Sequence, residues 1–141
     1  MSLTLENGIA SVTTNKCENP PSTLQSHTFK ITIPESQLSI AYWILKLADS
    51  FFIWIGPDNS PSFTDLSLAF LSKFQATPVV TKILGPTCDQ SPSTFPQRLS
   101  RKLKKPVYLS YNISNGSQSV HDAIEKTLME EIQNNTTVFS T

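Results

Sequence analysis

Five basic residues between positions 98 and 105 form the densest cluster of charge in this sequence. They are Arg98, Arg101, Lys102, Lys104 and Lys105. Side chains of this kind bind phosphate or carboxylate groups. The whole chain has eleven basic and eleven acidic residues, so its net charge of zero does not favour nucleic acid or an anionic membrane. The sequence alone favours a cluster that solvates the outer face of a helix and stabilises its C-terminal end. The alternative is that it contacts a partner, and an acidic protein then fits the neutral chain better than nucleic acid does.

The sequence offers few residues for catalysis or for binding a metal or cofactor. His27 and His121 stand far apart and form no catalytic or metal-binding spacing. The four glycines are isolated, so they form no phosphate-binding loop. Asp49 and Asp65 lie in turn-forming surroundings, which favour solvated turns over a carboxylate pair. We expect no catalytic residue, no metal, no cofactor and no enzymatic activity.

Aromatic residues are concentrated in two neighbouring segments, 38–48 and 51–56. Successive side chains of a strand point to opposite faces, so the aromatic residues of two paired strands cannot all enter one small core. Those that point outward form an association surface if no helix covers that face of the sheet. The alternative is a core with its share of aromatic residues. The candidates for partner contact are Trp43, Phe52 and Trp54.

The elements that position these residues follow from the apolar periodicity. Alternating or β-branched segments bounded by turn residues predict six strands, with the last of them central in the sheet. They lie at 28–33, 38–48, 51–56, 66–71, 77–84 and 107–113. Apolar residues every three or four positions predict two amphipathic helices, one from Thr94 to the basic cluster and one from a capping-box spacing of Ser119 and Asp122 to Ile132.

These elements predict an α+β fold: a single domain with a mostly antiparallel β-sheet of about six strands and two helices packed on it. The chain of 141 residues and 15.6 kDa has room for one such domain. We expect a flexible N-terminal arm at 1–26, the domain at 27–134 and a frayed tail at 135–141. No signal peptide or membrane-spanning run is visible, and Cys17 and Cys88 have no metal-binding spacing, so we expect a soluble intracellular protein.

Four stretches carry a resemblance to a known family. They are LADSFFIWIG at 47–56, QRLSRK at 97–102, VYLSYN at 107–112 and IEKTLMEE at 124–131. In this order and spacing the chain resembles the proteasome assembly chaperone 4 family over about residues 39–132. It departs from the family in a longer start rich in Ser, Thr and Pro, and in an extended loop at 57–64.

The resemblance implies a eukaryotic, non-enzymatic and ATP-independent chaperone. It implies a heterodimer with proteasome assembly chaperone 3 that promotes formation of the α-subunit ring of the 20S core particle, in the cytoplasm and also in the nucleus. We expect the aromatic hairpin to join the heterodimer and the basic helix to approach a proteasome α-subunit. The alternative is a small adaptor that binds nucleic acid or a phosphorylated ligand through the basic helix at 98–105.

Overall fold

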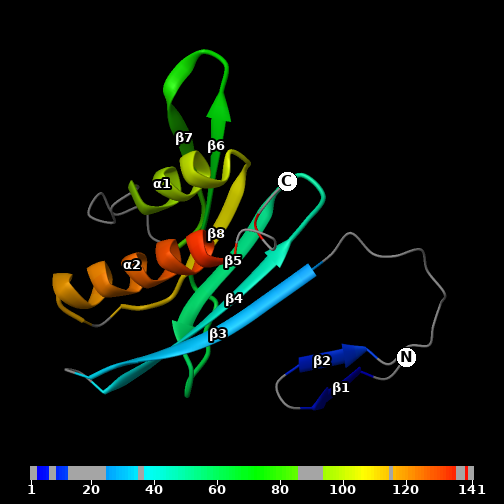
Figure 1. Cartoon of the computed structure of the whole chain (residues 1–141), viewed down its shortest axis with the longest axis vertical. Helices are drawn as coiled ribbons and strands as arrows, with labels where there is room; N and C mark the ends of the chain where they lie inside the picture. Colours follow the sequence, from blue (N-terminus) through cyan, green and yellow to red (C-terminus); the bar gives the residue numbers. More distant parts are fainter. Residues whose placement is uncertain are drawn as a thin grey trace.

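The structure of the protein is a computed structural model that describes residues 3–6, 9–12, 25–34, 37–85, 94–114, 116–135 and 139. Six strands form one sheet in the order β3-β4-β5-β8-β6-β7 (Figure 1). Its neighbours pair antiparallel except β5 and β8, which are parallel, so the predicted sheet is confirmed. The strands are β3 (Gln25–Ile33), β4 (Leu38–Lys46), β5 (Phe51–Pro57), β6 (Leu66–Ser72), β7 (Gln75–Leu84) and β8 (Val107–Tyr111).

The last strand lies in the middle of the sheet, as its apolar sequence predicts. β8 pairs with β5 from Phe51↔Val107 to Ile55↔Tyr111, and its other edge pairs with β6. A parallel neighbour requires a long crossover, because the chain must return to the same end of the sheet. The β6–β7 hairpin and the first helix provide that crossover.

Both helices, α1 (Thr94–Leu103) and α2 (Gln118–Asn134), lie on the same face of the sheet (Figure 1). The apolar stripes of the helices meet the buried residues of β4, β5 and β8 there and form the core, which confirms the predicted packing of two helices on the sheet. In the described chain neither helix is long and apolar enough to cross a membrane. The helix residues in this core are Phe95, Leu99, Leu103, Val120, Ile124, Leu128 and Ile132.

The start of α2 differs from the sequence prediction. The N-cap residue is Ser117, whose side chain makes no capping hydrogen bond, and the oxygen atoms of the Ser117 and Ser119 hydroxyls lie 2.8 Å apart. Asp122 accepts a hydrogen bond of 2.9 Å from the side-chain amide of Gln118. The predicted capping box of Ser119 and Asp122 is therefore wrong. With the cap at Ser117, the third helical residue is Val120, an apolar residue that cannot complete a capping box.

The N-terminal segment contains two strands that the sequence did not predict. β1 (Leu3–Glu6) and β2 (Ile9–Val12) pair antiparallel in a separate two-stranded sheet. Strands of four residues are too short to show a sustained apolar period. Most of the predicted flexible arm at 1–26 lies outside the described residues, so that domain boundary stays a prediction.

Phe139, in the C-terminal segment, belongs to the core. Phe139 is buried, with its ring centroid 5.8 Å from that of Phe51 and 6.3 Å from that of His27. His27 Nε2 lies 2.8 Å from a carboxylate oxygen of Glu131, which joins β3 to the end of α2. Phe139 falls within the frayed tail expected at 135–141, and that expectation stays a prediction, because most of this segment lies outside the described residues. Residues 136–138 and 140–141 lie outside the described residues.

Two tyrosines on the helix-covered face should make the protein less stable at alkaline pH. The Tyr42 hydroxyl donates to the Ile124 carbonyl at 3.0 Å, and the Tyr111 hydroxyl oxygen lies 2.5 Å from His121 Nδ1. Burial raises the pKa of both tyrosines above the usual value of 10.0, and the carboxylates of Glu125 and Asp122 raise that of Tyr111 further.

Above about pH 10 the unfolded chain therefore loses tyrosine protons that the folded chain keeps, so stability falls with rising pH by about 1.4 kcal/mol per pH unit for each tyrosine. Urea unfolding between about pH 10 and 12 measures this slope. Tyr42→Phe should roughly halve it. A slope that Tyr42→Phe leaves unchanged would contradict the assignment.

Candidate partner-binding surfaces

The face of the sheet opposite the helices, here called the open face, carries a continuous set of apolar side chains. The register aligns Trp43 with Trp54 across β4 and β5, and aligns Phe52 with Tyr108 and then Leu68 across β5, β8 and β6. Among the described residues no helix covers this face (Figure 1). Its large apolar residues are Trp43, Leu45, Phe52, Trp54, Leu68, Phe70, Val79 and Tyr108.

The three predicted aromatic residues lie together on the open face. Trp43 is 44% exposed, and its ring meets that of Phe52 edge-on with centroids 6.5 Å apart. Phe52 also stacks on Phe63 at 6.2 Å. The neighbouring Tyr42 and Phe51 are instead buried against the helices. The aromatic hairpin therefore divides between core and surface as strand alternation requires.

Residues 58–65, here called the strap, hold Trp54 against the open face. Trp54 Nε1 donates a hydrogen bond of 2.9 Å to the Ser62 carbonyl. A Cβ atom at Gly56 would lie 2.6 Å from the Trp54 indole. Position 56 must therefore be glycine for the indole to pack in this place. The backbone N–H of Thr64 donates to Asn112 Oδ1 at 2.8 Å and fixes the far end of the strap. Trp54 is therefore partly covered, and Trp43, at 44% exposure, is the more accessible of the two tryptophans.

Polar side chains border the open face. Lys30 Nζ on β3 lies 3.2 Å from a carboxylate oxygen of Asp58 at the start of the strap. The other β3 residues that share this face are Ser26, Thr28 and Thr32, as their pairing with β4 shows. An aromatic centre with a polar border is the usual composition of a protein–protein interface.

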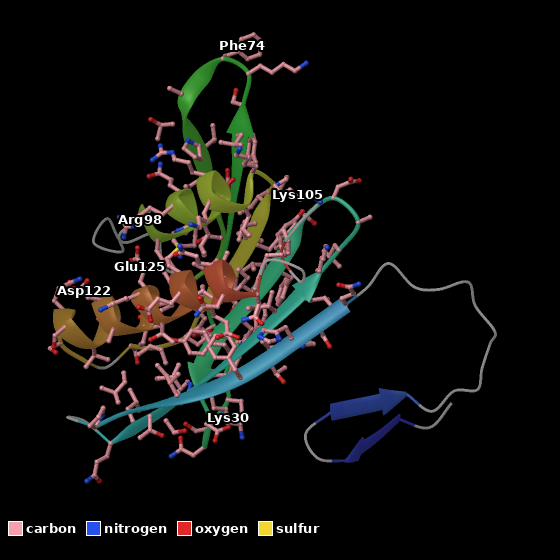
Figure 2. The ribbon with its side chains drawn as sticks, in the orientation of Figure 1. Lys30, Phe74, Arg98, Lys105, Asp122 and Glu125 are labelled. Carbon is pink, nitrogen blue, oxygen red and sulfur yellow. The ribbon has the colours of Figure 1, made fainter. Side chains whose placement is uncertain are left out.

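Two of the five basic residues contact their own chain. Arg98 Nη2 donates to Glu125 Oε1 at 2.6 Å and Arg98 Nε donates to the second oxygen, a bidentate pair that joins α1 to α2 (Figure 2). This hydrogen bonding raises the pKa of Arg98. Lys105 Nζ lies 6.0 Å from the centroid of the Phe51 ring and 3.5 Å from the Ala48 carbonyl oxygen. Contacts within the chain therefore account for the positive charges of Arg98 and Lys105.

The other three members of the basic cluster, Arg101, Lys102 and Lys104, are exposed. None of them forms an ion pair with another described residue. Lys104 ends the helix in a left-handed conformation with φ of 58°, and the buried Ser100 hydroxyl donates to the Lys105 carbonyl at 3.0 Å. This fixed turn holds the three charges at the C-terminal end of α1, where they are accessible to a partner.

The residues considered for catalysis do not form a site. Asp65 pairs with Lys82 and accepts a hydrogen bond from the Tyr111 backbone, whereas Asp49 is exposed in the β4–β5 turn. His27 and His121 each contact a residue of the folded core, as described above. Within the described ranges, no three His, Cys, Asp or Glu side chains gather as a metal site would require.

Sequence reasoning missed several residues of these surfaces. Phe63 lies in a polar loop, and nothing in the sequence indicates that it stacks on Phe52. Tyr108 and Leu68 become neighbours only through the insertion of β8 between β5 and β6. Alternation within each strand indicates the face of each side chain, but not the order of the strands.

Comparisons with known proteins match most of this region. A family model of proteasome assembly chaperone 4 matches residues 39–113. The curated proteins named proteasome assembly chaperone 4 from Homo sapiens and Mus musculus are each 33% identical over 94 residues, which is 67% of this chain and 75% of the relative. A crystal structure of a novel chaperone complex for yeast 20S proteasome assembly has a similar fold, with a TM-score of 0.58, 12% identity, and coverage of 84% of this chain and 98% of that chain. The family match runs from β4 to just beyond β8 and includes the open-face aromatic residues and the basic cluster.

Proposed function

Because this chain belongs to the proteasome assembly chaperone 4 family, we propose that it promotes assembly of the α-ring of the 20S proteasome as a heterodimer with proteasome assembly chaperone 3. In this proposal it acts by binding alone, without catalysis or a cofactor, in the cytoplasm and also in the nucleus. The family membership supports the role in proteasome assembly. The identity of the chaperone partner and the action on the α-ring go beyond family membership and need their own tests.

The observation that carries the heterodimer is the open face. Trp43, Phe52 and Phe63 form a contacting aromatic cluster on a sheet whose other face is already covered by helices. Monomeric proteins rarely leave such a patch in water, and a second sheet can cover it by stacking face to face. The polar border of Lys30 and Asp58 would then lie at the rim of the interface.

The basic end of α1 supports a second, separate contact. Arg101, Lys102 and Lys104 are exposed and belong to the helix-covered side of the molecule, so a partner on the open face leaves them accessible. In the proposal these residues approach an acidic surface of a proteasome α-subunit. Two independent surfaces allow the chain to hold its chaperone partner and an α-subunit together.

Purification of the tagged protein from its own cells tests the proposal. We expect a similar-sized chaperone and proteasome α-subunits to co-purify without mature β-subunits. At high salt the α-subunits should be lost first, because charge contacts are screened while apolar contacts persist. Nucleic acid or unrelated proteins in place of α-subunits would contradict the proposed function and would favour the adaptor alternative.

A further inference from the structure

The β6–β7 hairpin extends beyond the rest of the sheet and presents a phenylalanine at its tip. β6 pairs with β8 only from Ser67 to Ala69, and Ala69 lies opposite the first residue of β8. The chain from there to the tip therefore projects past the end of β8 (Figure 1). Phe74 is 93% exposed and points away from the molecule (Figure 2), and its backbone N–H donates to the Ser72 hydroxyl at 3.1 Å. An ordered turn thus holds a large apolar side chain in water.

The same end of the sheet carries a concentration of positive charge. α1 leads directly into β8, so the C-terminal end of the helix lies at the end of the sheet from which the hairpin projects. Residues 71–76 and 101–106 contain no acidic residue. The acidic residues Asp122, Glu125, Glu130 and Glu131 lie on α2, and Asp49 in the β4–β5 turn is an exposed acidic residue at this end of the sheet. The basic residues of the two segments are Lys73, Arg101, Lys102, Lys104 and Lys105.

From this juxtaposition we infer that the projecting hairpin is a docking element that inserts Phe74 into an apolar pocket with an acidic rim on a proteasome subunit. The inference rests on the proposed function and specifies how its second contact is made. Burial of a phenylalanine provides affinity, and the surrounding basic residues match an acidic rim. The tip of the hairpin projects past the end of β8, so a partner stacked on the open face over β4, β5 and β8 leaves Phe74 accessible.

The chemistry favours a protein pocket over nucleic acid. Proteins that bind single strands lay several aromatic rings along a basic groove, where successive bases stack. Here one ring stands alone at the tip of a turn, and the other exposed aromatic residues lie on the open face away from the basic residues. A single projecting side chain fits a pocket, which is the usual geometry of an interface anchor.

Phe74→Ser in the full-length chain tests the inference, with purified proteasome α-subunits as the probe. We expect the dissociation constant for the α-subunit that binds to rise about thirtyfold, as truncation of an interface anchor typically produces. The matched control is Ile83→Ser, which removes a 51% exposed apolar side chain near the base of the same hairpin. The control should change the constant by no more than about twofold, and pairing with the chaperone partner should be unchanged in both variants.

The charge contribution is tested separately with Lys73→Glu and Arg101→Glu combined. We expect about tenfold weaker binding at low salt and a smaller difference at about 0.5 M salt, where charges are screened beyond a few ångströms. Lys126→Glu on α2 is the matched control for Arg101→Glu alone, since it makes the same single charge reversal on an exposed residue of another element. Equal weakening by the control would show a non-specific effect of net charge. It would overturn the inference that the basic residues near Phe74 contact an acidic rim on the proteasome subunit.

The outcomes separate the two proposals. If the unaltered chain binds an α-subunit and Phe74→Ser binds it equally well, the docking element is wrong and the proposed function stands. If the unaltered chain, with its chaperone partner present, binds no α-subunit, the proposed function fails and the docking element fails with it. Tighter binding of single-stranded DNA than of any α-subunit would also overturn the inference.

Discussion

Replacing Trp43 and Phe52 together by glutamate should abolish pairing with the proposed partner, proteasome assembly chaperone 3, at micromolar concentrations. Each side chain is an aromatic anchor near the centre of the open face, and truncation of one such anchor costs about 2 kcal/mol or more of binding free energy. The two changes together should raise the dissociation constant about a thousandfold. The burial of two carboxylates against an apolar partner acts in the same direction.

Isothermal titration calorimetry with the purified partner measures this effect, and circular dichroism verifies that the variant is folded. Phe74→Glu is a matched control, because it makes the same type of change on a phenylalanine that is still more exposed but lies outside the open face. The control should keep the dissociation constant within about twofold of the unaltered chain. Equal affinity of the double variant and the unaltered chain would remove the open face as the pairing surface.

Asn112→Ala should lower the free energy of unfolding by about 2 kcal/mol, because the buried Ser110 hydroxyl and the Thr64 backbone N–H lose their partner. The Ile55 carbonyl keeps its hydrogen bond from the backbone N–H of residue 112. Asn112 Nδ2 donates to the Ile55 carbonyl at 3.2 Å and to the Ser110 hydroxyl at 2.9 Å. Its Oδ1 atom accepts the Thr64 backbone N–H. Asn112 therefore links β5, β8 and the strap. These contacts give a structural role to the last residue of the VYLSYN stretch.

Urea denaturation followed by circular dichroism measures the change. Asn59→Ala, in an exposed position of the strap, is the matched control and should alter the free energy of unfolding by less than about 0.5 kcal/mol. We also expect Asn112→Ala to loosen the strap and to increase the exposure of Trp54, whose indole is held by Ser62. A stability loss no larger than that of the control would show that the network of Asn112 has no cooperative role.

Much of the fold is visible in the sequence because local periodicity follows from which faces are buried. Alternation in β3 and β4 and the four-residue spacing of Phe95, Leu99 and Leu103 give the correct elements. The insertion of β8 between β5 and β6 confirms its predicted central place, but its neighbours depend on non-local pairing that no local pattern specifies. Phe139 was missed for a related reason, since its burial depends on space beside Phe51 and not on its own neighbours in sequence.

The candidate site was predictable in type and less so in detail. The aromatic excess of the hairpin correctly indicates that some rings face outward, and strand alternation indicates which ones. The basic cluster looks uniform in sequence, yet Arg98 pairs with Glu125 and Lys105 approaches Phe51, so only three members are exposed without an ion pair to the described part of the chain. Whether a basic residue is paired or free to bind a partner depends on residues that are distant in sequence. The spacing of the charges along the chain does not indicate these contacts.

The measurement that tests the central claim most directly uses the two tryptophans of the chain, Trp43 and Trp54. Both lie on the open face, and Trp43 is the more accessible because Trp54 is held under the strap. Labelling this chain alone with 5-fluorotryptophan gives two fluorine signals, which can be followed while the proposed partner, unlabelled proteasome assembly chaperone 3, is added. Pairing through the open face predicts that the Trp43 signal shifts strongly and loses its response to D₂O, while the Trp54 signal shifts less. A complex that forms while both signals stay unchanged would contradict the account.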